Sequence, residues 1–477
     1  MPKVTLTPLT AMGGSWRHDL AHVSLMHGWA PVFIQVATAV VLVLGVGWRT
    51  RRWRTVWLPV AAVGGTGLCA WAHWYVGSAG LAGEPAPRSL WVWIAVTGLA
   101  GVAAIAGWRH SRWWRRALSA LAVPASLLCA ALALNLWVGY FPTVGTAWDQ
   151  LTAGPLPNQT DRATVTAMQL AGTVPAKGVV VPVDIGSSAS RFAHRRELVY
   201  LPPAWFGANP PPRLPTVMMV GAEFNTPSDW LRAGDAITTV DAFALAHGGF
   251  APVLVFVDSG GGFNVDTECV NGSRGNAADH LTKDVIPFLS SDFGTGTTGS
   301  TRGVVGFSSG GTCAIDLAVM HPELFGGFVD IAGDAGPNLG SKEQTVARLF
   351  GGSTAEWSAF DPTTVMTKHP AYNGVSGLFV TSGAAVDGHG TVAAPDTPQR
   401  SAANSLCALG HSRGIACAVV AETGRHDWPF AGRAFASALP WLAGQLGTPG
   451  VPRIPLPAPA ASAVTSSLAG KPLKLPG

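Results

Sequence analysis

One short run of the chain has the residue types and spacing of a catalytic nucleophile, Gly306-Phe307-Ser308-Ser309-Gly310. It follows an apolar, β-type run at Gly303–Val305 and precedes a helix-like run at Cys313–Met320. A serine with a glycine two residues away on each side, set between a strand and a helix, is the pattern of a nucleophile elbow. Glycine is required there because a Cβ would collide with the neighbouring strand or helix. The pattern predicts Ser308 as a nucleophile.

A serine hydroxyl needs a base that removes its proton, and the base needs a carboxylate that orients it. In α/β-hydrolases these groups follow one another along the chain in the order serine, acid, histidine. His426 lies in a loop directly after the last predicted strand, where this fold presents its base, and we favour it. His389, in a glycine-flanked loop, is the second candidate.

The acid should lie between the predicted strands at 377–381 and 416–420, and this window holds only Asp387 and Asp396. Asp387 follows its strand closely, which is the usual position of the acid, and it is the favoured candidate. Asp396 has the setting of a helix N-cap in Pro-Asp-Thr-Pro.

The oxyanion that forms during acyl transfer needs two backbone donors. The N–H of Ser309, the residue after the nucleophile, is the first, and Ala222, in the loop after the predicted strand 216–220, is the second. Carboxylates also occur near predicted strand ends, and they are either solvated loop charges or contacts for a cationic group of the substrate. Glu223 and Asp266 are the substrate-binding candidates among them, and Asp229 and Glu268 complete the set.

Short apolar, β-branched runs alternate with helix-like segments in the second part of the chain, which indicates an α/β-hydrolase fold with a mostly parallel sheet. The expected strands are 179–183, 197–201, 216–220, 253–257, 303–306, 327–331, 377–381 and 416–420. The expected helices are 231–247, 277–290, 312–320 and 398–409. We therefore expect a catalytic domain at 177–447, preceded by a linker at 149–176 and followed by a Pro/Ala-rich tail at 448–477.

Residues 1–148 have a different composition. They contain 14 of the 19 Trp residues and 11 Lys+Arg, but Asp19 and Glu84 are their only carboxylates. The arginines lie in short loops and form no patch with nucleic-acid-binding features, so we expect no nucleic-acid partner.

Four apolar stretches in this first part approach the roughly 20 residues that cross a bilayer as a helix. They cover 29–48, 56–76, 90–108 and 117–138, and tryptophans flank each of them. Arginine-rich loops follow the first and third stretches, so the positive-inside rule places these loops in the cytoplasm. The sequence thus predicts a four-helix membrane domain at 1–148 in the cell membrane, with everything after Trp137 extracytoplasmic.

Cysteine usage fits an exported domain. Cys69 and Cys129 lie inside the apolar stretches, whereas four cysteines lie in the predicted exported part, where disulfides form. Among those four, Cys407 and Cys417 are close in sequence and are the favoured pair. The chain has no Cys-x-x-Cys motif and no zinc-type spacing, so we expect no metal and no cofactor.

Several short runs together resemble the putative-esterase family, which includes esterase D and the secreted mycolyltransferases of mycobacteria. The runs are Arg196–Pro203, Asp266–Cys269, Leu281–Pro287, Gly306–Gly311, His321–Phe325 and Gly424–His426. The resemblance covers about 190–445, and the overall layout is similar to actinobacterial membrane esterases with several N-terminal spans. It implies a cofactor-free Ser-His-acid enzyme with Ser308 as nucleophile and His426 as base. The mycolyltransferases use a Glu as the acid, and this chain has no Glu in the corresponding window.

These observations favour a membrane-anchored extracytoplasmic serine esterase that hydrolyses a lipid or cell-envelope ester through an acyl-enzyme. Aminoacyl-phosphatidylglycerol is a candidate substrate because its ammonium group suits a nearby carboxylate. An acyltransferase that moves an acyl group to a sugar is the first alternative. A non-catalytic membrane scaffold with a relic hydrolase domain is the second.

Overall fold

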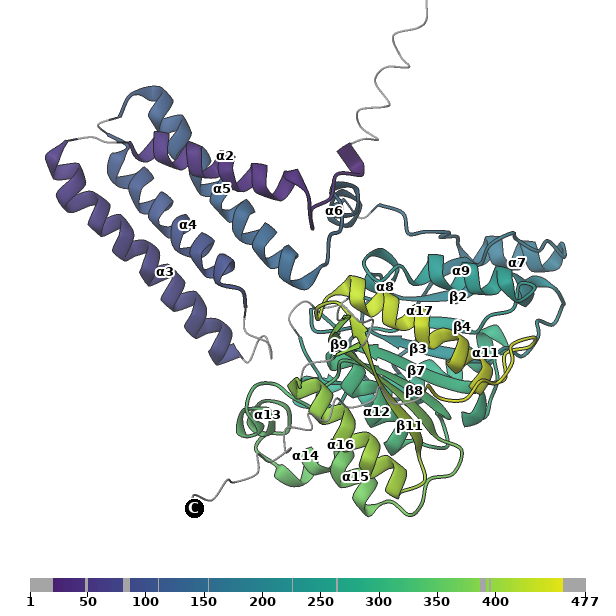
Figure 1. The fold of residues 1–477 in the computed structure, drawn as a ribbon. Coiled ribbons are helices and arrows are strands. Elements are labelled where there is room, and N and C mark those ends of the chain that lie inside the picture. Colours follow the sequence, from purple (N-terminus) through teal and green to yellow (C-terminus); the bar gives the residue numbers. More distant parts are fainter. Residues whose placement is uncertain are drawn as a thin grey trace, which may run out of the picture.

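The computed structural model describes residues 20–47, 50–79, 86–109, 111–152, 154–224, 226–262, 265–386, 392–393 and 396–457. It contains a bundle of four long helices and an α/β domain at one end of that bundle (Figure 1).

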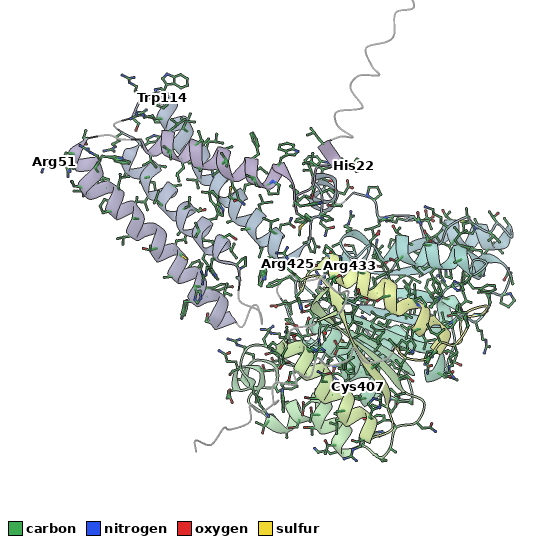
Figure 2. All side chains as sticks on the ribbon, in the orientation of Figure 1. His22, Arg51, Trp114, Cys407, Arg425 and Arg433 are labelled. Atoms are coloured by element: carbon green, nitrogen blue, oxygen red, sulfur yellow. A yellow bond between two sulfur atoms is a disulfide. The ribbon has the colours of Figure 1, made fainter. Side chains whose placement is uncertain are left out.

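The bundle consists of α2 (Trp29–Val46), α3 (Leu58–Ala79), α4 (Arg88–Gly107) and α5 (Trp113–Val138), and a π-helical turn, η2 (Trp53–Trp57), leads into α3. All four helices are long and apolar enough to cross a membrane. Helix α5 packs against α2 and α4, and α4 packs against α3. Glycines allow the last contact, because a Cβ on Gly65 would lie 2.4 Å from the carbonyl oxygen of Ala95. Figure 2 places Arg51 and Trp114 at the end of the bundle remote from the α/β domain.

The α/β domain is built on a nine-stranded sheet in the order β1-β2-β4-β3-β7-β8-β9-β10, with β11 also paired to β9. The strands are β1 (Val179–Val183), β2 (Glu197–Leu201), β3 (Thr216–Val220), β4 (Val253–Phe256), β7 (Arg302–Phe307), β8 (Gly327–Ile331), β9 (Ser376–Val386), β10 (Val392–Ala393) and β11 (Ala416–Thr423). Strands β4, β3, β7, β8, β9 and β11 run parallel, whereas β1, β2 and β10 pair antiparallel. A strand-helix alternation with a parallel centre confirms the predicted α/β-hydrolase fold.

Helices cover both faces of this sheet and form two hydrophobic cores. Helices α7 (Arg162–Leu170), α11 (Ile286–Phe293), α12 (Ser309–Met320) and α16 (Pro398–Ser412) contribute to one core. Helices α8 (Asp229–Arg232), α9 (Ala236–Ala246) and α17 (Trp428–Gln445) contribute to the other. Because both faces are covered, the central strands are buried and mostly apolar, as the sequence suggested, with Asp330 on β8 as a buried exception.

Two predicted helices differ from the structure. The segment 231–247 divides into α8 and α9, because Asp235 between them adopts a left-handed conformation with φ of 49°. The segment 277–290 consists of α10 (Ala277–Asp279), the π-helical η4 (His280–Val285) and α11.

Several elements had no counterpart in the prediction. Three short helices fill the connection between β8 and β9: α13 (Lys342–Leu349), α14 (Thr354–Phe360) and α15 (Pro362–Lys368). Side chains of Ser341, Ser353 and Asp361 cap their N-termini. The remaining small elements are the 3-10 helices η3 (Pro203–Phe206) and η5 (Gly299–Thr301) and the two-residue strands β5 (Asn271–Gly272) and β6 (Gly275–Asn276).

The segments flanking the α/β domain pack onto it. Helix α6 (Val144–Leu151) follows the bundle, and α7 inserts the buried Val165 into the first core. After α17, Val451 and Leu456 pack against the second core.

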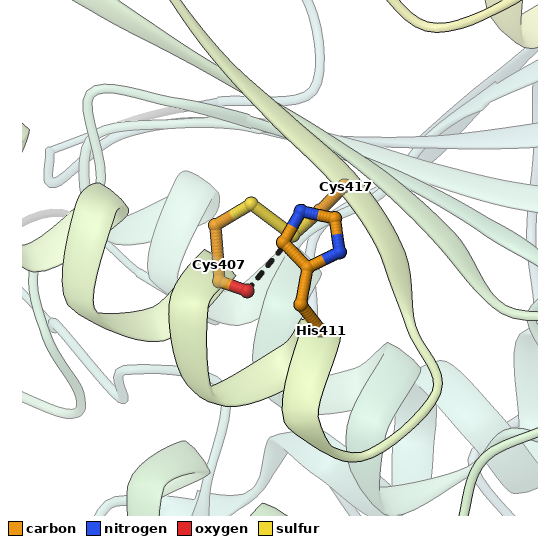
Figure 3. A group of neighbouring side chains, drawn as sticks. All are labelled: Cys407, His411 and Cys417. Atoms are coloured by element: carbon orange, nitrogen blue, oxygen red, sulfur yellow. Dashed lines mark hydrogen bonds between the residues drawn. A yellow bond between two sulfur atoms is a disulfide. The ribbon is translucent and has the colours of Figure 1, made fainter. Parts of the chain in front are cut away.

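Two disulfides tie helices to neighbouring segments. The predicted pair Cys407–Cys417 is confirmed, with an S–S distance of 2.06 Å, and it joins α16 to β11 beside His411 (Figure 3). Cys269–Cys313 is the second pair, and it joins α12 to the loop that follows β4.

Candidate active site

Ser308 occupies a sharp turn between β7 and α12. Its φ of 59° and ψ of −122° lie in a region that non-glycine residues avoid, so the surrounding structure must hold it there. The Ser308 N–H donates to the carbonyl of Ile331 on β8, at 2.9 Å. Its own carbonyl accepts from the N–H of Thr312, at 3.1 Å. These bonds fix the turn from both sides, in the manner of a nucleophile elbow.

The flanking glycines have the steric role that the sequence indicated. A Cβ on Gly306 would lie 1.7 Å from the carbonyl oxygen of Gly310. A Cβ on Gly310 would lie 2.3 Å from the carbonyl oxygen of Gly221, at the end of β3. This second contact brings the start of α12 against the loop that carries Ala222.

A cleft beside the elbow gathers four of the predicted site residues. Ala222, Ser309, Glu223 and Asp266 all line it, and its empty volume is about 360 Å³, part of which is open to solvent. The two residues expected to donate the oxyanion N–H groups therefore face the same space as the two expected to contact the substrate.

Three carboxylates, Glu223, Asp258 and Asp266, line this cleft, and Glu268 contacts one of them. Burial raises the pKa of Asp266, which accepts the N–H of Glu268 at 3.0 Å. Burial and repulsion from Asp266 raise the pKa of the Glu268 carboxyl well above its usual range. Burial disfavours the charged form of Asp258, but the hydrogen bonds and the charge of Arg195 outweigh this effect and lower the pKa of the carboxyl. Asp258 is thus an ionised carboxylate whose charge Arg195 balances.

His426 lies after β11 and close to the elbow. Its ring stacks at a tilt on Phe307, the residue before the nucleophile, with 4.9 Å between the ring centroids. The N–H of Gly383 on β9 donates to the carbonyl of Gly424, at 2.9 Å. Therefore the end of β9, after which the predicted acid follows, is bonded to the loop that carries the predicted base.

The favoured acid, Asp387, falls outside the described part of the chain, and so does the second candidate base, His389. Asp396 is described and is exposed to solvent. The interpretation of Asp396 as a helix N-cap is wrong by one residue, because the side chain of Thr397 caps α16 by accepting the N–H of Arg400.

The end of α5 contacts the loop that carries His426. Gly139, with φ of 70°, ends the helix, and a Cβ there would lie 2.8 Å from the Cβ of Asp427. The Arg425 guanidinium donates to the carbonyl of Leu136 on α5, at 2.9 Å. Arg425 accordingly lies at the junction of the bundle and the α/β domain (Figure 2).

The same exit segment contacts Asp229 at the start of α8, the short helix that follows the loop with Ala222. The Tyr140 hydroxyl donates to Asp229, and Asp229 in turn accepts the N–H of Thr226 at 2.6 Å. Asp229 is fully buried, so the alternative of a solvated loop charge is wrong for this residue, and likewise for the buried Glu268. Sequence reasoning missed these contacts because the partners are 89 residues apart in the chain. The one available signal was a tyrosine directly after an apolar span.

The chain is similar to several known proteins. An uncharacterized protein of Corynebacterium glutamicum is 28% identical over 335 residues, which cover 69% of this chain and 76% of that protein. An S-formylglutathione hydrolase from Agrobacterium tumefaciens is 15% identical, with a TM-score of 0.46, over 57% of this chain and 97% of that one. A ferulic acid esterase has the same identity, TM-score and coverage of this chain, over 99% of its own length.

The model of the family described as "Putative esterase" matches residues 190–442, which is more than half of the chain and includes the elbow, the cleft and His426. The chain therefore belongs to the Putative esterase family and has a hydrolase domain of the α/β type.

Proposed function

We propose that this protein is a membrane-anchored serine esterase that hydrolyses a lipid or cell-envelope ester on the extracytoplasmic side. The observation that carries this proposal is the contact of the α5 exit with the loop of His426 and with Asp229, which in turn binds the loop of Ala222. An elbow serine beside a cleft supports ester chemistry, and the exit contact supports a position of that chemistry next to the bilayer surface.

The proposed reaction begins when His426 accepts the proton of Ser308 as its Oγ attacks the ester carbonyl. The N–H groups of Ser309 and Ala222 stabilise the oxyanion, and Asp387 orients the imidazole. Collapse expels the alcohol, which takes the proton from His426, and leaves an acyl-serine. Water then repeats the same steps and releases the acid.

The contacts at the α5 exit favour a lipid substrate. Gly139 and Leu136 lie at the end of a helix that is apolar enough to span a membrane, and they touch the loop on either side of His426. The opposite end of the bundle carries Arg51 and the arginine-rich loops expected in the cytoplasm (Figure 2). An ester at the headgroup level of the outer leaflet would then lie near Ser308.

The carboxylates of the cleft favour a substrate with an ammonium group, as in aminoacyl-phosphatidylglycerol. Glu223 and Asp266 both line the cleft. A carboxylate in the lining attracts a cationic α-amino group next to the scissile ester.

Lipid mass spectrometry tests this function. Purified full-length wild type, Ser308→Ala and Ser309→Ala are each incubated with total polar lipids in mixed micelles. Ser309→Ala is the matched control because it removes a neighbouring hydroxyl but keeps the backbone N–H that the mechanism uses. We expect loss of a lipid ester with wild type and Ser309→Ala, and a rate about 10⁶-fold lower with Ser308→Ala. An unchanged lipid profile with all three proteins would contradict a lipid-ester substrate.

Acyl transfer is a second candidate, and a second cleft favours it. That cleft has an empty volume of about 790 Å³, and Asn338 in its lining donates a backbone N–H to Glu268, behind the first cleft. Transfer requires an acceptor that competes with water for the acyl-serine. An acylated sugar among the products, in place of free acid, would show transfer.

A further inference from the structure

A buried cluster of two histidines and a carboxylate lies behind the cleft wall. His194 belongs to the loop before β2, Glu197 begins β2, and His280 begins η4. One possible ligand atom from each lies within 4.8 Å of the others. The side chains of Glu197 and His280 are fully buried, and that of His194 is 11% exposed. None of the three lines the catalytic cleft.

Glu197 has one satisfied oxygen and one unsatisfied oxygen. Its Oε1 accepts the N–H of Asp258 at 3.0 Å and lies 3.2 Å from Nε2 of His280. Its Oε2 is buried and accepts no hydrogen bond from any residue in the described ranges. The His194 Nδ1 is 4.0 Å from this oxygen. A buried carboxylate oxygen that accepts no hydrogen bond is costly, and a bound cation would remove that cost.

The surroundings of both histidines fit metal ligands. His280 Nδ1 lies 3.4 Å from Asp284, whose carboxylate accepts the backbone N–H groups of Ala189 and Ser190. His194 Nδ1 lies 2.9 Å from the carbonyl oxygen of Arg195. Ligating histidines typically donate one ring N–H to a carboxylate or a backbone carbonyl, which orients the ring and raises the basicity of the other nitrogen.

The distance between two of the ligand atoms and the charge of the site agree with an ion in tetrahedral coordination. Two ligand atoms about 2.0 Å from zinc lie roughly 3.3 Å apart, close to the 3.2 Å between His280 Nε2 and Glu197 Oε1. Two imidazoles and one carboxylate are a donor set that suits zinc and similar borderline ions. Glu197 and Asp284 together would balance the charge of a divalent cation.

We propose that His194, Glu197 and His280 form a binding site for one Zn²⁺-like divalent transition-metal ion, with Asp284 orienting His280 through its Nδ1. The ion ties the loop before β2 to η4 and, through Glu197 and the N–H of Asp258, to the wall of the cleft. This role is structural and does not depend on which reaction Ser308 performs. The sequence did not reveal the site because His194 and Glu197 are three residues apart but His280 is 83 residues further on.

In the competing arrangement, the cluster holds no metal ion and His280 carries an additional proton. Burial disfavours a charged His280, but Glu197 and Asp284 more than compensate and raise its pKa. A protonated His280 between two carboxylates would also be electrically balanced. Metal analysis distinguishes the two, because only one of them binds an ion.

The test uses full-length protein in detergent, stripped with a chelator, dialysed and titrated with Zn²⁺, with Mg²⁺ as the comparison ion. We expect one equivalent of zinc by elemental mass spectrometry, a higher melting temperature with Zn²⁺ and no such change with Mg²⁺. Glu197→Gln and His194→Ala should abolish the tight equivalent, and Asp284→Asn should weaken binding about 10- to 100-fold. Loss of zinc from His194→Ala is the result that misfolding explains least, because His194 is the least buried of the three proposed ligands.

His411→Ala is the matched control. His411 lies beside the Cys407–Cys417 pair (Figure 3), a group that could bind zinc if its disulfide were reduced. Retention of the zinc equivalent in His411→Ala would assign it to the proposed site. A wild-type protein without tightly bound zinc, or with zinc that Glu197→Gln and His194→Ala both retain, would overturn the proposal in favour of a protonated His280.

Discussion

The bundle and the α/β domain place their side chains in opposite ways. In the bundle, large apolar residues face outward, such as Ile105 at 80% exposed and Phe33 at 62%, and small residues such as Ala61 and Ala103 are buried. In the α/β domain, large residues such as Phe256 and Phe293 are fully buried. This difference is what the proposed membrane position of the bundle would produce. Helices in lipid gain little by hiding large apolar groups and pack through small residues, whereas a domain in water buries the large ones.

The two interiors also differ in their ionisable groups. Among the described residues, the buried polar side chains of the four long helices are Ser, Thr and Asn. The α/β domain buries several carboxylates, including Asp316 on α12 and Asp330 on β8. Burial raises the pKa of Asp330 to about 7. Such groups make the stability of the α/β domain depend on pH, whereas the described residues of the four long helices include no buried carboxylate.

The largest expected effect contrasts two phenylalanines. Phe256→Ala, in the core, should lower the free energy of unfolding by about 3–5 kcal/mol. Phe33→Ala, on the outward face of α2, should change it by less than about 1 kcal/mol in nanodiscs, because lipid replaces the lost contacts. Denaturation monitored separately in each region measures both. Equal losses would show that the face with Phe33 packs against protein rather than lipid.

The second prediction concerns Asp330. Its pKa of about 7 in the folded protein exceeds the ordinary 3.8, so the unfolded chain releases this proton first as the pH rises. The contribution of this group to the free energy of unfolding is therefore lost between about pH 4 and pH 7, by roughly 4 kcal/mol at most. Asp330→Asn should remove that loss and raise the melting temperature at pH 8 more than at pH 5. Asp184→Asn, at an exposed position, is the control and should leave the pH profile unchanged, and an identical profile for Asp330→Asn would contradict this cause.

The smallest effect tests the contact between the two regions. Arg425→Ala removes the hydrogen bond to Leu136 of α5 and should loosen the loop with His426. We expect about tenfold slower labelling of Ser308 by a fluorophosphonate, which corresponds to about 1.4 kcal/mol, with little change in melting temperature. Arg453→Ala, whose guanidinium bonds the carbonyl of Gln445 away from this loop, serves as the control. Equal labelling rates for the two variants would show that α5 anchors the domain without positioning its base.

Local patterns predicted a large part of the molecule. The elbow at Ser308 was visible because glycine spacing, a strand and a helix are all encoded within about fifteen residues of sequence. The four long helices were visible because length and apolarity are sums along the chain. Boundaries were less accurate. The break at Asp235 depends on a single left-handed residue, and α13–α15 are too short for periodicity to distinguish them from loops.

The sequence by itself therefore determined the two classes of domain, the nucleophile turn and the Cys407–Cys417 bridge, because each depends on residues close together in the chain. Only the tertiary structure decided which distant groups meet. Ala222 and Asp266 share a cleft with Ser309 because the ends of parallel strands converge at one edge of the sheet. The contacts of Arg425 with α5 and of His280 with Glu197 arise from chain folding over many residues. No local pattern records such pairs, because their energy appears only when both partners are buried together.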